Sequence, residues 1–110
     1  ITAKGKTLMV SAKDTFLTFF KVHGAALDGS ETIYFNINEE PDGSNLVKRI
    51  ACGIDTFNNI ICVYATKEEM AILKGGWTYW YDMTMDTSQG LHMTLIYPSR
   101  FVVREVMHSD

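Results

Sequence analysis

The stretch that decides the fold is Thr66–Asp86, TKEEMAILKGGWTYWYDMTMD. It joins the clearest short helical pattern in the chain to the most regular alternating segment. Thr66 is suited to cap a helix, and Glu69 follows it at the three-residue spacing of a capping box. Gly75 can adopt the left-handed conformation that ends a helix. The stretch therefore predicts one short helix over about residues 66–74, followed at once by a strand.

The strand predicted over Trp77–Asp86 has two chemically different faces. One face is polar except for Trp80, and the other is apolar or aromatic. The apolar face consists of Trp77, Tyr79, Tyr81, Met83 and Met85. Because successive side chains of a strand point to opposite sides, this pattern is typical of a strand buried on one side. We therefore expect Tyr79 and Tyr81 in the core and Trp80 pointing away from it.

Short β-prone segments separated by turn residues flank this stretch on both sides. The turns include two Asp-Gly-Ser triplets, at residues 28–30 and 42–44, and Asp-Gly is a strong turn signal. Besides Trp77–Asp86, the predicted strands are Thr7–Ala12, Thr15–Val22, Glu31–Asn38, Leu46–Cys52, Asn59–Ala65, Leu91–Tyr97 and Phe101–Met107. Pro98 is expected to separate the last two strands. Seven to nine short strands with one helix predict an all-β fold, an immunoglobulin-like antiparallel β-sandwich.

The strand parities also predict the core. The side chains expected to be buried are Phe19, Ile33, Phe35, Ile37, Tyr79, Tyr81 and Val103. The doublet Phe19-Phe20 interrupts simple alternation, which indicates a bulge or burial on both sides of that strand.

The two cysteines lie in segments that are expected to pair. Leu46–Cys52 and Asn59–Ala65 are predicted to form a hairpin around the turn-like residues 53–58. Cys52 and Cys62 would then lie opposite each other, and a disulfide would be geometrically allowed. Free buried thiols are the favoured interpretation for two cysteines in such a chain.

The composition is that of an ordinary globular domain. The 110 residues are 46% hydrophobic and 21% charged, with a net charge of −3. These values fit a single β-sandwich domain over residues 1–110 and argue against disorder. The ten basic residues form no run or stripe, so we expect no nucleic-acid partner. The apolar runs are too short to cross a membrane as a helix, so we expect no membrane partner either.

The residues that commonly carry chemistry are scattered. His23, His92 and His108 are isolated from one another, so no metal site or cofactor is predicted. Asp82 and Asp86 share a strand face, but four strand residues span about 13 Å. A retaining pair of catalytic carboxylates needs about 5 Å. No nucleophile elbow or phosphate-binding glycine loop occurs. We therefore expect that the protein is not an enzyme.

Four short motifs follow one another along nearly the whole chain. They are Lys13-Asp14-Thr15 before Phe16–Val22, Leu27-Asp28 before Thr32–Ile37, the capped turn Thr66–Leu73 before Gly76, Trp77, Tyr79, Tyr81 and Asp82, and Gly90 before Thr94-Leu95-Ile96 and Phe101-Val102-Val103. In this order they resemble a family of small β-sandwich structural domains of tailed phages and prophages. The layout is similar to that of the N-terminal domains of upper-baseplate proteins. The chain departs from the pattern at Lys13 and at Tyr97-Pro98, where glycine is commoner.

The resemblance implies a non-enzymatic phage virion structural protein. Such a protein would be an adaptor, a decoration or fibre-base module, or a neck or baseplate component. Its implied partners are other phage structural proteins, and a homo-oligomer is expected. Its implied location is the virion, after assembly in the cytoplasm of the bacterial host. The family brings no catalytic, cofactor-binding or metal-binding residues.

A ligand-binding β-sandwich, such as a carbohydrate-binding module, is the alternative from a different class. Trp80, Tyr34 and Tyr97 are the aromatic residues that would stack on sugars. The same three are the candidate interface residues of a virion protein, since an exposed Trp among polar neighbours is common at interfaces. Alternatively, Ile1–Lys4 or a neighbouring loop covers Trp80 within the monomer. A planar row of aromatics would favour the sugar-binding interpretation, and packing through edge strands would favour the virion protein.

Overall fold

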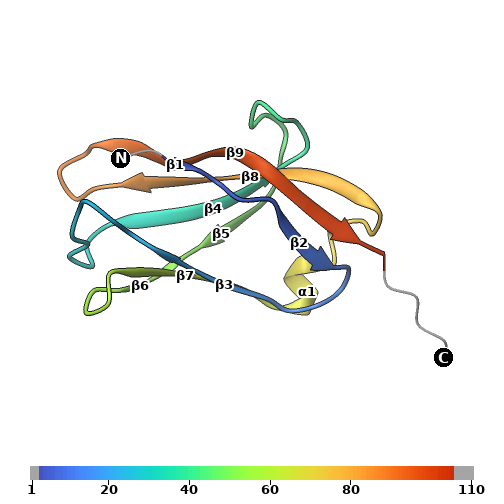
Figure 1. Ribbon diagram of the computed structural model, residues 1–110, viewed down its shortest axis with the longest axis horizontal. Coiled ribbons are helices and arrows are strands. Elements are labelled where there is room, and N and C mark those ends of the chain that lie inside the picture. The colour runs from blue at the N-terminus through green and yellow to red at the C-terminus, as the bar shows by residue number, and fades with distance from the viewer. Residues whose placement is uncertain (1–2, 106–110) are drawn as a thin grey trace.

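Two β-sheets pack face to face in the computed structural model of the protein, which describes residues 3–105 (Figure 1). The larger sheet has the order β1-β9-β8-β4-β5, and β2 also pairs with β9. Its strands are β1 (Ala3–Lys4), β2 (Leu8–Ser11), β4 (Thr32–Asn38), β5 (Leu46–Ala51), β8 (Trp77–Asp86) and β9 (His92–Arg104). The smaller sheet has the order β3-β7-β6, with β3 (Phe16–Lys21), β6 (Gly53–Asp55) and β7 (Ile60–Ala65). The predicted all-β sandwich with one short helix is confirmed.

The pairing is antiparallel except at the N-terminus, where β1 and β2 run parallel to β9. This differs from the wholly antiparallel sandwich that was expected. The reason is that β2 turns directly into β3 of the opposite sheet, and not into a neighbour in its own sheet. Lys13 lies in this turn with φ = 67°, a left-handed conformation that glycine adopts more easily.

The helix α1 (Lys67–Met70) begins as predicted and ends early. The Thr66 side chain accepts a hydrogen bond from the Glu69 backbone N–H, and the Glu69 side chain accepts one from the Thr66 N–H. After Met70 the α-helical hydrogen bonding gives way to a tighter turn, in which Leu73 N–H donates to the Met70 carbonyl three residues back. The left-handed glycine is Gly76 (φ = 83°) and not Gly75. The expected extent of 66–74 is therefore too long.

The two predicted C-terminal strands are one strand, β9, which continues through Pro98. Proline has no backbone N–H, and it stands where β9 changes its outer partner. β1 pairs with β9 as far as Tyr97, and β2 pairs from Phe101 onward. On the other side of β9 the pairing with β8 shifts register at the same place, between Ser99 opposite Tyr81 and Ile96 opposite Met83. The missing donor therefore falls at an interruption of the pairing on both sides of the strand. The end of the second predicted segment, at Met107, lies outside the described residues.

The predicted hairpin of Leu46–Cys52 with Asn59–Ala65 is wrong. β5 pairs with β4 in the larger sheet, and the chain crosses to the smaller sheet at Cys52. The short strand β6 then pairs with β7, which places Gly53 and not Cys52 opposite Cys62. Both thiols are free, and burial raises the pKa of Cys52 to about 12. Its thiolate is therefore scarce at neutral pH.

The core lies between the sheets and centres on Phe35, whose exposed fraction is 0%. Its ring stacks on Tyr81 at 5.0 Å and contacts Phe16 and Phe101 at 5.5 and 6.0 Å. Six of the seven predicted core residues are buried: Ile33, Phe35, Ile37, Tyr79, Tyr81 and Val103.

The prediction for Phe19 is wrong, because its side chain is 60% exposed. β3 pairs with β7 in unbroken register from Phe16 to Lys21, so the strand has no bulge. Phe16 is buried in the core and sets the parity of the strand. Phe20 therefore points inward, and Phe19 points away from the core on the outer side of the smaller sheet.

Candidate functional site

The three aromatic candidates lie on the larger sheet without forming a row. Trp80 and Tyr34 are partly buried, whereas Tyr97 is 57% exposed. Trp80 has the predicted parity, since its neighbours Tyr79 and Tyr81 are buried in the core. Trp80 lies opposite Asn38 and Arg100, and Tyr34 lies opposite Thr84. No ring contact joins any two of the three candidates.

A polar network occupies the outer face of the larger sheet between these aromatics. Asn36 Nδ2 donates to Asp82 Oδ1 at 2.8 Å, and Asn38 Nδ2 donates to Asp82 Oδ2 at 3.2 Å. Arg49 Nε donates to Asn36 Oδ1 at 2.8 Å. The Arg49 guanidinium also lies 5.0 Å from the centre of the Tyr34 ring. Because these groups satisfy one another, the network holds the sheet together and offers few free groups to a ligand.

A turn lies over this network and helps to bury it. A Cβ atom on Gly43 would lie 3.2 Å from Asp82 Oδ2 and 3.4 Å from Pro98 Cγ. Asp42 holds the turn, because its side chain accepts hydrogen bonds from the backbone N–H and the hydroxyl of Ser44. These bonds lower the pKa of Asp42. The burial of Asn36 and Asn38 is therefore a property of the monomer.

The outer side of the smaller sheet is apolar, and we call it the apolar face. Its members are Leu17, Phe19, Ile60, Cys62 and Tyr64. Leu17 lies opposite Tyr64, and Phe19 lies opposite Cys62. Leu17, Phe19 and Tyr64 are each more than half exposed. Gly53 of β6 also lies opposite Cys62 and presents no side chain to it.

Charged and aromatic groups border the apolar face at the β6–β7 turn. Lys21 Nζ donates to the Asn58 carbonyl at 2.5 Å. Hydrogen bonds from the Asn58 side chain and backbone lower the pKa of Asp55. Phe57 lies at the tip of this turn and is 94% exposed. One end of the apolar face is thus bordered by one cation, one anion and a solvent-exposed ring.

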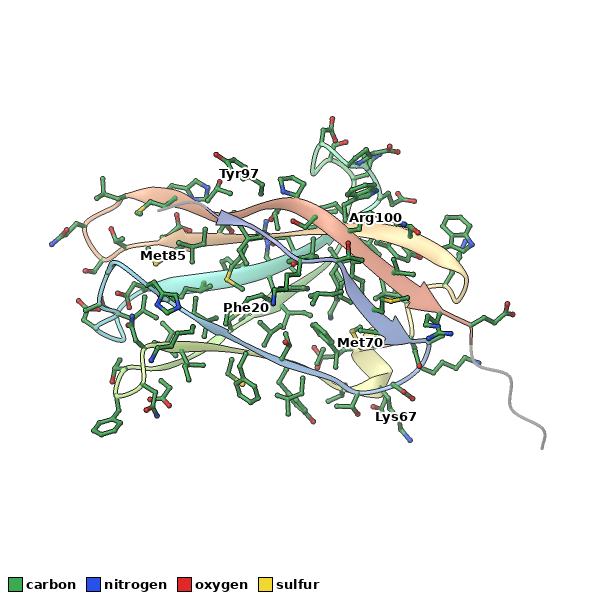
Figure 2. The ribbon with its side chains drawn as sticks, viewed as in Figure 1. Phe20, Lys67, Met70, Met85, Tyr97 and Arg100 are labelled. Carbon is green, nitrogen blue, oxygen red and sulfur yellow. The ribbon has the colours of Figure 1, made fainter. Side chains whose placement is uncertain are left out.

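The space between the sheets is open along one edge, where it forms a groove of about 790 Å³. One wall is the inner side of β3 with Thr18 and Phe20, continued by Val22 just after the strand. The opposite wall includes Leu8 and residues of β8 and β9, among them Met83, Met85, Met93, Leu95 and Ile96. Figure 2 shows Phe20 and Met85 pointing into the space between the sheets and Tyr97 pointing away from it. A smaller hollow of about 340 Å³ separates β2 from the first half of β3.

The described part of the chain offers no other obvious site. Within residues 3–105, no three His, Cys, Asp or Glu side chains gather as a metal site would require. No helix in that range is long and apolar enough to cross a membrane.

Sequence reasoning missed the apolar face, although a signal for it was present. The segment Ile60–Ala65, IICVYA, is apolar at both strand parities. A half-buried strand in a monomer usually alternates between apolar and polar residues. An unbroken apolar strand in a small sheet therefore indicates a second apolar surface. The sequence does not say whether that surface is covered.

Comparison with known proteins adds no assignment. No protein-family model matches the chain. No curated protein is significantly similar to it.

Proposed function

We propose that the protein is a non-enzymatic structural component of a tailed-phage virion that acts by docking on other phage proteins. The observation that carries the docking role is the apolar face of the smaller sheet. Contiguous exposed apolar side chains are typical of interaction sites, and interface centres are enriched in aromatic residues and poor in charged ones. Leu17, Phe19 and Tyr64 have this composition.

The contrast with the larger sheet supports the same role. The outer face of that sheet also carries aromatic side chains, but its central polar groups already bond to one another. A partner that docked there would gain few new hydrogen bonds. On the apolar face, a partner would remove large apolar side chains from water, which is the main favourable term in association.

The phage context rests on the motif resemblance, and the turn at Lys13 is in keeping with it. The family more often has glycine where this chain has a left-handed Lys13. A module of this kind would serve as an adaptor, a decoration or fibre-base part, or a neck or baseplate component. Its proposed location is the virion.

The sugar-binding alternative has less support from the geometry. Sugar-binding aromatics would need to present their faces together on an open surface. Here the Asn36–Asp82 network separates Tyr34 from Trp80, and Trp80 is partly buried. Tyr97 is the one exposed ring of the three.

The test uses the phage or induced prophage whose genome carries the coding sequence. Mass spectrometry of purified virions should detect the protein at a fixed number of copies per particle. Tyr64→Ser on the apolar face should lower its incorporation. Tyr97→Ser is the matched control, because Tyr97 is equally exposed (57% against 53%) but lies on the other sheet.

Two results would contradict the proposal. Absence of the wild-type protein from virions would remove the virion role. A loss of incorporation in Tyr97→Ser with no loss in Tyr64→Ser would remove the role of the apolar face. Glycan binding that depends on Tyr97 would favour the sugar-binding alternative.

A further inference from the structure

The strand β3 is a free edge that lacks the protection found at the other edges. Among the described residues it pairs with β7 alone. Native proteins protect edge strands by shortness, charge, proline or bulges. β3 has six residues, of which four are apolar and one, Lys21 at its end, is charged.

Each of the other edges has such protection. β6 has three residues, one of which is Asp55. β1 and β2 have two and four residues and are separated by residues 5–7. β5 carries Lys48 and Arg49, and its pairing with β4 shifts register at Ile37 and Asn38. β3 is thus the edge on which another strand could add most readily.

The backbone of β3 presents three residues to such a strand. Val22 N–H donates to the Asn59 carbonyl, so even-numbered residues direct their backbone groups toward β7. Backbone groups alternate sides along a strand. The odd-numbered residues Leu17, Phe19 and Lys21 therefore each direct one N–H and one carbonyl toward the free edge of the sheet, on the side away from β7.

The space beside this edge is open along its length. The hollow between β2 and β3 borders Phe16, Leu17 and Thr18. The groove between the sheets borders Thr18 to Val22. Figure 1 shows β3 along the rim of the smaller sheet, with β1 and β2 at the edge of the other sheet. An added strand would lie over the mouth of both openings.

We propose that β3 pairs antiparallel with β3 of a second copy, with the two-fold axis at Phe19. In this register Phe19 faces Phe19 of the second copy, and Leu17 faces its Lys21. It is the antiparallel register in which all three outward-facing residues of the strand pair with one another. The two smaller sheets then form one continuous six-stranded sheet, and the two apolar faces join.

The strand is self-complementary in this register, which favours a second copy over an unrelated strand. The paired aromatic rings of Phe19 are a favourable cross-strand contact. Lys21 is the only charged residue of β3, and it faces Leu17, so no like charges meet. On the inner side, Thr18 of one copy faces Phe20 of the other, beside the groove that leaves Phe20 partly exposed. The inference goes beyond the proposed function, because the dimer forms whether or not the protein belongs to a virion.

Analytical ultracentrifugation of the purified protein, from micromolar to millimolar concentration, tests the dimer. Leu17→Lys places lysine opposite Lys21 twice across the two-fold axis. Like charges directly opposite destabilise a strand pair, so the dissociation constant should rise about tenfold. The double variant Leu17→Lys, Lys21→Glu places opposite charges in both pairs and should restore the wild-type value to within about threefold. Tyr64→Ser, on the same face but outside β3, should leave the dissociation constant of the dimer unchanged.

Circular dichroism melting of each variant shows whether it is folded. If Leu17→Lys does not fold, Phe19→Pro is the second variant. It removes both the outward-facing donor and the aromatic ring of residue 19 at the proposed two-fold axis, while the β7 side of the strand keeps its donors, so the dimer should again weaken. A wild-type monomer at millimolar concentration overturns the dimer. A dimer that withstands Leu17→Lys or Phe19→Pro overturns the β3 interface. Loss of the dimer in both charge variants overturns the register.

Discussion

The two sheets differ most on their outer faces. On the larger sheet, Asp82 joins two buried amides, and Arg49 completes the network. On the smaller sheet, the corresponding side carries Leu17, Phe19 and Tyr64, more than half exposed. Both sheets bury their inner faces in the same core.

This difference shows which surface is complete within the monomer. The polar face has its hydrogen bonds made, so its residues stabilise the fold. The apolar face leaves Leu17, Phe19 and Tyr64 more than half exposed, so these side chains are free to contact a partner. Substitutions on the polar face should therefore change stability, and substitutions on the apolar face should change association.

Phe35→Ala should have the largest effect and tests whether the inner side is the true core. Phe35 contacts four aromatic rings in the fully buried centre. We expect a loss of about 3–5 kcal/mol in the free energy of unfolding, as is usual for a buried Phe. Phe19→Ala on the outer side should cost about 0.5 kcal/mol or less in the monomer. Chemical denaturation at a protein concentration too low for dimers to form measures the free energy of unfolding of both variants. Equal losses would mean that the parity of β3 is wrong.

Asp82→Ala should come next, because it leaves the buried Asn38 amide without its acceptor and the Asn36 amide with only Thr84 Oγ1, at 3.3 Å. An unsatisfied buried polar group costs about 1–3 kcal/mol, and we expect a loss in this range. Thr78→Ala is the control, since Thr78 is exposed on the same side of β8. It should change stability by about 0.5 kcal/mol or less. A neutral Asp82→Ala would show that the polar face is not structural.

Gly5→Ala compares the edges of the two sheets. A Cβ atom on Gly5 would lie 2.5 Å from Tyr81 Oη and 2.6 Å from Ser99 Oγ. Ile96 Cγ2 would also lie at 2.7 Å, and both hydroxyls are held by hydrogen bonds, so we expect a loss of about 1–3 kcal/mol from overpacking. Gly53→Ala meets nothing closer than 3.8 Å, in the side chain of Cys62, and should be neutral or slightly stabilising. Thermal melts of the two variants measure the contrast, and equal melting temperatures would contradict the close packing under β1.

The smallest effect on stability should come from two exposed aspartates in turns. Asp42 lies in the turn over the polar network, and Asp55 lies in the β6–β7 turn beside the apolar face. Hydrogen bonds from Ser44 and Asn58 lower the pKa values of Asp42 and Asp55 below the usual 3.8. A carboxyl whose pKa is lower in the folded state adds stability above its unfolded pKa and loses it as the pH falls through the folded value. Wild-type stability should therefore fall more steeply below pH 3.8 than that of Asp42→Asn or Asp55→Asn. Parallel curves from denaturation at each pH would show that these turns contribute nothing.

Local patterns in the sequence determined the elements and most of the core. The capping box at Thr66 and Glu69 formed as predicted because its hydrogen bonds lie within four residues. The alternation of Trp77–Asp86 placed Tyr79 and Tyr81 inside and Trp80 outside, since strand parity is a property of the local backbone. The two Asp-Gly-Ser triplets formed the same serine-bonded turn for the same reason.

The tertiary structure alone decided which strands pair and which apolar side is covered. Turn residues lie on both sides of β5, at 42–44 and 53–58, so local patterns allow a hairpin with β4 or with β7. β5 joined β4, and the chain changes sheets at Cys52. Pro98 was accommodated within β9 because β1 and β2 meet that strand on either side of it. Phe19 and Phe20 are the same residue type at adjacent positions, and the parity signal is weak: Phe20 shares its parity with Phe16, and Phe19 shares its parity with Lys21. Phe20 faces the space between the sheets only because Phe16, four residues earlier on the same side of β3, packs against Phe35 and Phe101 across the core.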